Sequence, residues 1–172
     1  VQLDRSGWTV TASSQEIYGE GTSHGYASNI KDGNTSTFWH SRYTGGNAAK
    51  PHWIMVNLGS VQTIDAFNYV ARMANITGCN GNIENYKLYI STSAPTTTNI
   101  SGTMEEVASG EFSYTGSNTE HLITLDNSVE AQYVLLYAVS THGSIDDTFA
   151  NCSEFYLYKN EYFTNFGTST RT

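Results

Sequence analysis

Oxygen-bearing side chains gather in residues 32–37, which read Asp-Gly-Asn-Thr-Ser-Thr. A carboxylate, an amide and several hydroxyls at this density suit a hard cation such as calcium. The segment is not an EF-hand, because counting from Asp32 puts Thr37 where that motif needs glycine and Tyr43 where it needs glutamate. A simple turn shaped by Asp32 and Gly33 is the alternative.

Glu154 is a second carboxylate that needs an explanation, since it lies beside Phe155 in an otherwise apolar segment. A buried carboxylate without a partner is costly. Glu154 therefore either meets a cation or lies on a wet face of its strand.

Hydrolytic chemistry finds little support in the carboxylates. Cleavage of a glycoside needs two acidic groups that face each other at a defined separation. The adjacent pairs Glu105 with Glu106 and Asp146 with Asp147 do not suit this, because neighbours on a strand point to opposite faces. The sequence also has no G-x-S-x-G, no HExxH and no phosphate-binding loop. We expect a protein that is not an enzyme.

The elements that must position these residues are strands. Short runs of β-branched and aromatic residues, punctuated by Gly, Asn, Ser and Asp, are typical of an antiparallel all-β domain. Tyr86, Leu88 and Ile90 alternate with Lys87 and Tyr89, which predicts one buried and one wetter face and hence two sheets packed face to face. The expected strands are 8–13, 53–58, 64–72, 85–91, 105–114, 121–125, 132–140 and 153–159. Residues 93–102 are expected to form a polar loop without regular structure.

The composition predicts one globular domain of secreted or cell-surface type. The chain has 172 residues and a net charge of −8, with no cluster of Lys or Arg. Such a balance disfavours nucleic acid and anionic membranes. No stretch is apolar enough to span a bilayer. We expect a monomeric domain over residues 1–161, followed by a tail or linker at 162–172; a bacterial periplasm or outer surface would suit it.

Only two cysteines are present, Cys79 and Cys152. Their spacing does not suit a metal-thiolate site, so they form either one disulfide or two buried free thiols. A disulfide would close a long loop and favour an oxidising compartment.

Five segments in order resemble the discoidin, or coagulation factor 5/8 type C, family as found in family 32 carbohydrate-binding modules. They are DGNTSTFWHS at 32–41, PHWIMVNLG at 51–59, NGNIENYKLYIS at 80–91, AQYVLLY at 131–137 and CSEFYLY at 152–158. The resemblance covers residues 8–158. It implies an antiparallel jelly-roll β-sandwich of the galactose-binding-like type that binds carbohydrate without catalysis, as the targeting module of a parent protein.

The resemblance also implies particular site residues. A structural calcium ion would be held by main-chain oxygens near Asn29, by the Asp32 carboxylate, by Asn34 and Thr37, and by Glu154. A mono- or oligosaccharide of the galactose or N-acetylhexosamine type would be bound by residues at one end of the sandwich: His40, Tyr43, Arg72, Asn80 and Phe149. His142, Asp146 and Asp147 lie in the same late loop as Phe149 but match no motif position.

The sequence departs from the family pattern at residues 73–79, where the loop between Arg72 and Asn80 is longer than usual. A bridge between Cys79 and Cys152 would tie this loop to the Phe149 loop and pre-organise the site. The alternatives to a lectin-like module are an adhesion module that recognises protein, a spacer without a sugar site, and an accessory domain of a glycoside hydrolase.

Overall fold

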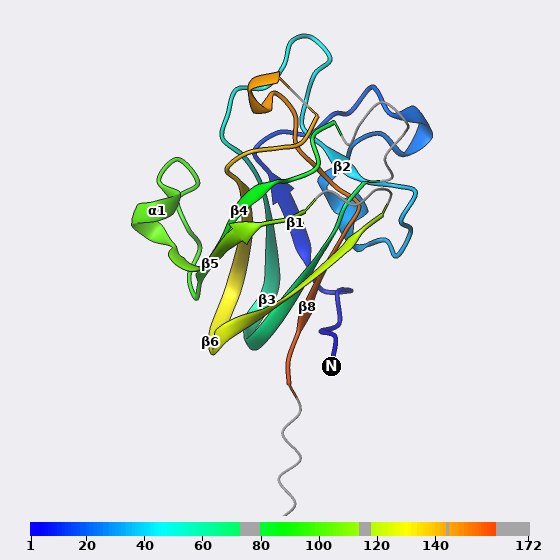
Figure 1. Ribbon diagram of the computed structural model, residues 1–172. Coiled ribbons are helices and arrows are strands. Elements are labelled where there is room, and N and C mark those ends of the chain that lie inside the picture. The colour runs from blue at the N-terminus through cyan, green and yellow to red at the C-terminus, as the bar shows by residue number, and fades with distance from the viewer. Residues whose placement is uncertain (73–79, 114–117, 144, 161–172) are drawn as a thin grey trace, which may run out of the picture.

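The computed structural model describes residues 1–72, 80–113, 118–143 and 145–160 (Figure 1). The strands are β1 (Thr9–Ala12), β2 (Trp39–His40), β3 (His52–Val70), β4 (Asn85–Ser91), β5 (Glu105–Glu111), β6 (Glu120–Ala138), β7 (Asn151–Cys152) and β8 (Glu154–Tyr158). The helical turns are η1 (Gly21–Ser23), η2 (Ala27–Lys31), α1 (Ile100–Thr103) and η3 (Ile145–Asp147). No helix of the described segments is long and apolar enough to cross a membrane.

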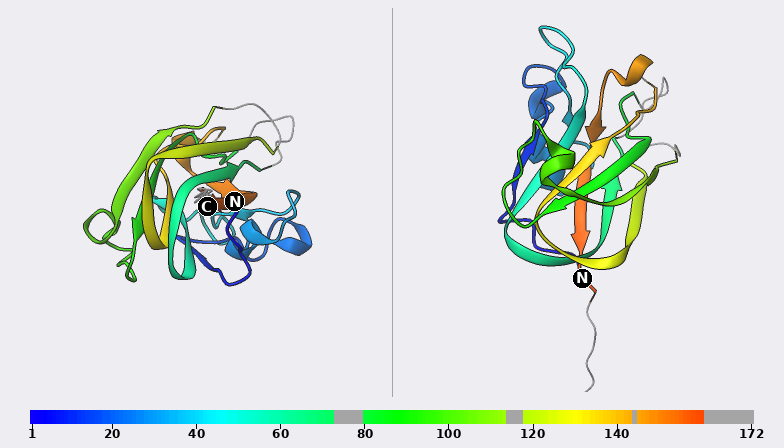
Figure 2. Two further views of the ribbon diagram at one scale, coloured as in Figure 1. Left: turned by 90° about the horizontal axis from the view of Figure 1, so that it is seen from below. Right: turned by 90° about the vertical axis from the view of Figure 1, so that its left-hand side faces the viewer.

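The chain forms an antiparallel β-sandwich whose two layers share two long, bent strands (Figure 2). The first part of β3 pairs with β1 on one side and with the last part of β6 on the other. The last part of β6 also pairs with β4, and β4 pairs with the edge strand β5. The last part of β3 pairs with β8 and with the first part of β6. Register shifts after Asn57 and Ile64 mark the bend, and Gly59 there has a φ of 86°, which suits glycine.

The predicted all-β sandwich is therefore confirmed, with corrections to its elements. The strands predicted at 53–58 and 64–72 are two parts of β3, and those at 121–125 and 132–140 are two parts of β6. The prediction of irregular structure at 93–102 is wrong at its end, where α1 begins at Ile100. The predicted tail at 162–172 lies outside the described residues.

Two clusters of side chains form the core. The larger cluster fills the space between the layers and contains Trp39, Phe67, Leu88, Leu136 and Phe155. A smaller cluster of Trp53, Tyr89, Ile100, Met104 and Leu135 lies on the other face of β4. Tyr89, expected on a wetter face, is buried because α1 and the residue that follows it cover that face.

The ends of the sandwich differ in character. Val1 and Lys159 exchange main-chain hydrogen bonds of 2.7 and 2.8 Å at one end. The loops around β2 and η3 lie at the other end (Figure 1). The predicted ligand-binding residues belong to this second end.

Candidate functional site

The short pair of β2 with β7 positions the first predicted residues. Trp39 is opposite Cys152 and His40 is opposite Asn151. The Trp39 ring is fully buried and donates from Nε1 to the Ser14 carbonyl at 2.8 Å, so it anchors β2 in the core. Neither two-residue strand was predicted, because so short a segment has no readable alternation.

Three rings meet where this pair ends. The His40 ring lies 5.1 Å from Tyr43 and 5.5 Å from Phe149, and Tyr43 lies 6.1 Å from Phe149. The Tyr43 ring is nearly perpendicular to both others, at 87° and 81°. We call His40, Tyr43 and Phe149 the ring cluster. The structure thus brings Phe149 next to His40 and Tyr43, which are more than 100 positions away in the sequence.

Burial and one hydrogen bond determine the tautomer of His40. Its side chain is 98% buried, with 2% exposed, and Nδ1 lies 2.6 Å from the Ser41 carbonyl oxygen. Burial lowers the pKa of His40, although the Ser41 carbonyl opposes the shift. A neutral ring that donates from Nδ1 keeps Nε2 as a hydrogen-bond acceptor.

Arg72 joins the ring cluster through a carboxylate that the sequence analysis missed. Its guanidinium lies 4.0 Å from the centre of the Phe38 ring, and Nη2 donates to Glu20 Oε2 at 3.2 Å. Tyr43 Oη donates to the other oxygen of Glu20 at 3.0 Å. Burial, together with Glu20, raises the pKa of Tyr43 to about 12, so this hydroxyl keeps its proton.

Glu20 has a backbone φ of 68°, in the left-handed region that non-glycine residues rarely occupy. Strained backbone of this kind is concentrated at functional sites. The available sequence signal was a single carboxylate in the glycine-rich stretch at 19–25.

Glu16 is a second missed carboxylate, and it connects two loops of the site. It is fully buried and accepts hydrogen bonds from the backbone nitrogens of Tyr18, Gly19, Tyr43 and Thr44 at 2.7–3.0 Å, and from the Thr44 hydroxyl at 2.8 Å. Burial opposes ionisation, but these donors outweigh it and lower the pKa of Glu16. The charged carboxylate therefore fixes the Glu20 loop against the Tyr43 loop.

Asn80 is held through its main chain by Asn151, the residue opposite His40. Its carbonyl oxygen accepts from Asn151 Nδ2 at 2.7 Å. The next residue, Gly81, has a φ of 94°, and a Cβ there would come within 3.2 Å of Phe149. The turn at Gly81 therefore packs directly against Phe149. The longer loop at 73–79 lies outside the described residues.

The other polar residues of the late loop serve contacts of their own. His142 lies 3.1 Å from Glu84 and 3.0 Å from the Phe112 carbonyl oxygen. Asp147 accepts from the Thr141 backbone nitrogen at 2.9 Å. Asp146 is exposed and has a φ of 53°.

The predicted calcium loop is a network of short-range hydrogen bonds. Asp32 accepts from the Asn34 nitrogen at 2.8 Å and from the Thr37 hydroxyl. The Asn29 side-chain nitrogen Nδ2 lies within hydrogen-bond distance of three carbonyl oxygens, those of Ser23, His24 and Phe38. The Ser153 hydroxyl donates to the Thr35 and Thr37 carbonyl oxygens. Because Ser153 directly precedes β8, these bonds join the loop to the start of that strand.

Glu154 is fully buried, which excludes the wet-face alternative. One of its oxygens accepts from Arg5, and the other, Oε1, is buried without a hydrogen-bond partner among the described residues. Burial raises the pKa of Glu154 to about 7, and the nearby Asp32 carboxyl adds to the shift. Two carboxylates close together, one with an unsatisfied oxygen, fit the donor set of a divalent cation.

Cys152 is the described member of the proposed disulfide. Its thiol is free, fully buried in the larger core cluster and 3.4 Å from the Glu154 carbonyl oxygen. The side chain faces the core because β7 pairs it with the buried Trp39. The proposed partner, Cys79, lies outside the described residues.

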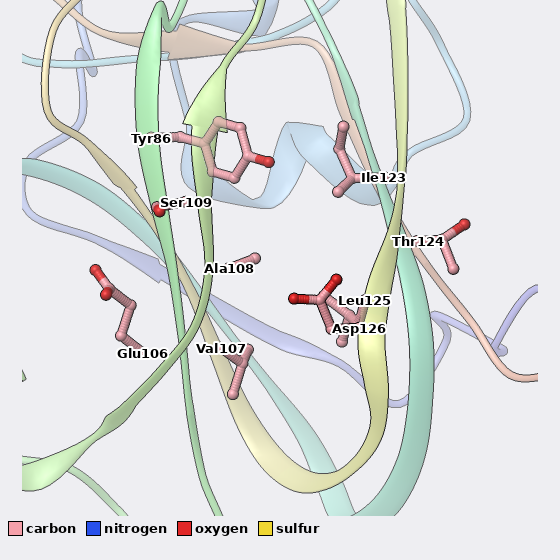
Figure 3. Close-up of a pocket in the computed structure, with 9 residues that line it drawn as sticks. All are labelled: Tyr86, Glu106, Val107, Ala108, Ser109, Ile123, Thr124, Leu125 and Asp126. Carbon is pink, nitrogen blue, oxygen red and sulfur yellow. The ribbon is translucent and has the colours of Figure 1, made fainter.

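A separate groove of about 340 Å³ opens between β5 and the first part of β6 (Figure 3). Asp126 points into it, whereas the Glu106 carboxylate extends away from Asp126 and lies 3.3 Å from Lys87. The groove is lined by Tyr86, Glu106, Val107, Ala108, Ser109, Ile123, Thr124, Leu125 and Asp126. These residues include none of the predicted site residues.

Comparison with protein families gives one match that covers most of the chain. The F5/8 type C domain matches residues 9–155. Two similar proteins are the sialidase of Micromonospora viridifaciens, 32% identical over 119 residues, and the lacto-N-biosidase of Bifidobacterium bifidum, 35% identical over 106 residues. The matches cover 67% and 60% of this chain but only 16% and 9% of those enzymes.

Solved structures share the fold. The module CpGH89CBM32-5 from Clostridium perfringens, in complex with GalNAc-β-1,3-galactose, has a TM-score of 0.72 and 24% identity, covering 92% of this chain and 100% of that chain. The family 32 carbohydrate-binding module of NanJ from C. perfringens, in complex with galactose, has a TM-score of 0.69 and 23% identity, covering 92% and 98%.

Proposed function

The chain belongs to the F5/8 type C domain family, and from this premise we propose that it is a non-catalytic carbohydrate-binding module. The observation that carries the proposal is the ring cluster with its Arg72–Glu20 pair at the loop end of the sandwich. Structurally similar modules were solved with galactose and with GalNAc-β-1,3-galactose, which supports a sugar of this type here.

The polar groups of the site complement a sugar hydroxyl, which both donates and accepts hydrogen bonds. Nε2 of His40 accepts, the guanidinium of Arg72 donates, and the Glu20 carboxylate accepts. The Asn80 amide would add a group of either kind. The half-buried rings of Tyr43 and Phe149 offer apolar surface to the C–H face of the sugar.

The charge balance of the site favours neutral sugars. Glu20 neutralises Arg72 at 3.2 Å, and the buried His40 is uncharged. A uronic or sialic acid would bring a carboxylate next to Glu20, and like charges at short range are unfavourable. Galactose and N-acetylgalactosamine carry no such group.

A glycan array in calcium buffer, with the protein clustered to raise avidity, tests the proposal. We expect binding to neutral galactose-type termini, lost in Arg72→Ala and retained in Lys87→Ala. Lys87 is the matched control because it is also a cation paired with a glutamate, Glu106, but in an exposed position. Absence of any glycan signal, with Arg72→Ala unchanged from the parent, would instead favour a protein-binding or spacer role.

We also propose that the residue 32–37 loop and Glu154 hold a structural calcium ion. The Asp32 and Glu154 carboxylates and the main-chain oxygens of Asn29, Asn34 and Thr37 would be its ligands, as the free Glu154 Oε1 supports. Bound calcium would neutralise the two carboxylates and fix the start of β8 against the loop. It would take no part in chemistry.

The setting that we propose is an extracellular or cell-surface enzyme that carries this module as an accessory domain. The similar enzymes act on glycans by their names, and the matched part is a small share of each. A module of this kind would keep its parent at glycan-rich surfaces.

A further inference from the structure

Tyr18 is exposed to an unusual degree for an aromatic residue of this protein. Its exposed fraction is 73%, whereas the rings of Tyr43 and Phe149 are half-buried. Among the described residues, the Tyr18 ring stacks on no other ring and its hydroxyl makes no hydrogen bond. Folding therefore leaves this ring without an intramolecular role.

The backbone that carries Tyr18 is nevertheless fixed. Its nitrogen donates to Glu16 Oε2 at 3.0 Å, and the next nitrogen, of Gly19, donates to the same oxygen at 2.8 Å. The other oxygen of this buried carboxylate holds the nitrogens of Tyr43 and Thr44. The Tyr18 peptide and the Tyr43 peptide are thus attached to one anchor.

Tyr18 is also adjacent to the proposed sugar site. Gly19 packs against Tyr43 so closely that a Cβ at this position would overlap the Tyr43 hydroxyl. Glu20, which binds Arg72 and Tyr43, follows directly. The Gly19 carbonyl is itself fixed by His24 Nδ1 at 3.3 Å.

We propose that Tyr18 is the platform of a second sugar subsite, which contacts the residue next to the terminal sugar of a bound oligosaccharide. The inference rests on the proposed function, because the ring cluster must first hold the terminal sugar. The predicted ligand class is a neutral disaccharide or longer glycan with a galactose-type terminus.

Two features favour a sugar over a protein surface at Tyr18. The ring does not belong to a broad apolar patch, because the other exposed apolar residues of segment 17–26, Ile17 and Tyr26, are only 39% and 38% exposed. The surrounding groups are polar, with Glu20 and His24 on the same loop. A fixed tyrosine loses little conformational entropy when a ligand packs on it.

Calorimetry with N-acetylgalactosamine and with GalNAc-β-1,3-galactose tests the subsite. We expect the parent to bind the disaccharide about fivefold more tightly than the monosaccharide. Tyr18→Ala should remove this difference and leave monosaccharide affinity unchanged. Tyr18→Phe should keep the difference, since the ring and not the hydroxyl makes the contact. Val61→Ala, at an exposed apolar residue in the bend of β3, is the control and should bind like the parent.

The outcomes separate the two proposals. Loss of all binding in Arg72→Ala but no effect of Tyr18→Ala would leave the proposed function intact and overturn the subsite. Equal weakening of both sugars by Tyr18→Ala would place the ring in the primary site and also overturn it. Failure of the clustered parent to bind either sugar would overturn both proposals. A fourth outcome would assign the ring to a protein partner instead: the parent still binds a glycoprotein after its glycans have been removed, and Tyr18→Ala does not bind it.

Discussion

At the scale of single residues, the site depends on carboxylates that face inward. No sequence motif predicts the roles of Glu16 and Glu20, yet each connects groups that are distant in the chain. Glu16 organises backbone, whereas Glu20 organises the Tyr43 and Arg72 side chains. Their roles predict different effects of substitution.

Glu16→Gln should destabilise the fold and weaken sugar binding together. A glutamine amide accepts through one oxygen only, so backbone donors now shared by two carboxylate oxygens would lose their partners. We expect a loss of about 2 kcal/mol in the free energy of unfolding, measured by urea denaturation. Glu111→Gln, at an exposed residue of β5, should have no effect. An unchanged unfolding midpoint would contradict the anchoring role.

Glu20→Gln should separate binding from stability. The amide can still accept from Tyr43, but it no longer neutralises Arg72, so the site becomes cationic. We expect weaker binding of neutral sugars with a thermal midpoint close to that of the parent, measured by calorimetry and differential scanning fluorimetry. A large loss of stability with normal affinity would show that Glu20 is structural.

His40 gives the site a dependence on pH. Burial lowers the pKa of His40 below its ordinary value of 6.5. Because the unfolded chain then binds the proton more readily, the stability that neutral His40 contributes is present above pH 6.5 and is lost as the pH falls below it. Protonated Nε2 can no longer accept, so sugar affinity should fall in the same direction. Titration calorimetry at a series of pH values from 7.5 to 5 measures the sugar affinity, and circular dichroism at each pH is the control for unfolding. Constant affinity down to a pH at which His40 is protonated in the folded chain would exclude Nε2 as an acceptor.

At the scale of elements, the residue 32–37 loop is stabilised by its own hydrogen bonds, but Glu154 Oε1 has no hydrogen-bond partner among the described residues. Removal of calcium with a chelator should therefore lower the thermal midpoint by several degrees, and added calcium should restore it. Asp32→Asn should abolish this response, whereas Asp126→Asn, in the groove of Figure 3, should keep it. An unchanged midpoint after chelation would mean that Arg5 alone compensates Glu154.

The elements also show what the sequence could and could not predict. The alternation in β4 was readable, and the strand spans 85–91 as expected. The bend of β3 was not readable as one strand, because the apolar pattern stops at Gly59 and resumes after it. β2 and β7 are defined only by each other, since each is two residues long and their pairing joins positions 40 and 151.

At the scale of the whole molecule, the same distinction applies to the site. His40, Tyr43, Arg72, Asn80 and Phe149 were predicted from the family resemblance; the rings of His40, Tyr43 and Phe149 lie together, and Tyr43 and Arg72 share Glu20. Glu16 and Glu20 did not follow, because their partners lie up to 52 positions away and only the folded chain defines them. For a related reason, spacing could not tell which face of its short strand Cys152 occupies; it faces the core.

The arrangement of the two ends suits a tethered module. Val1 and Lys159 are paired at one end of the sandwich, and the proposed sugar site is at the other (Figure 1). A bulky domain fused before Val1 should therefore leave the affinity for a single sugar unchanged. Two copies joined by a flexible linker should bind a dense glycan surface at least about 100-fold more tightly than one copy, because both sites can face the surface at once. Surface plasmon resonance on sparse and dense glycan coatings measures both effects. A gain of equal size on the sparse coating would show that the copies associate with each other, and a loss of single-site affinity on fusion would place the binding surface near the termini.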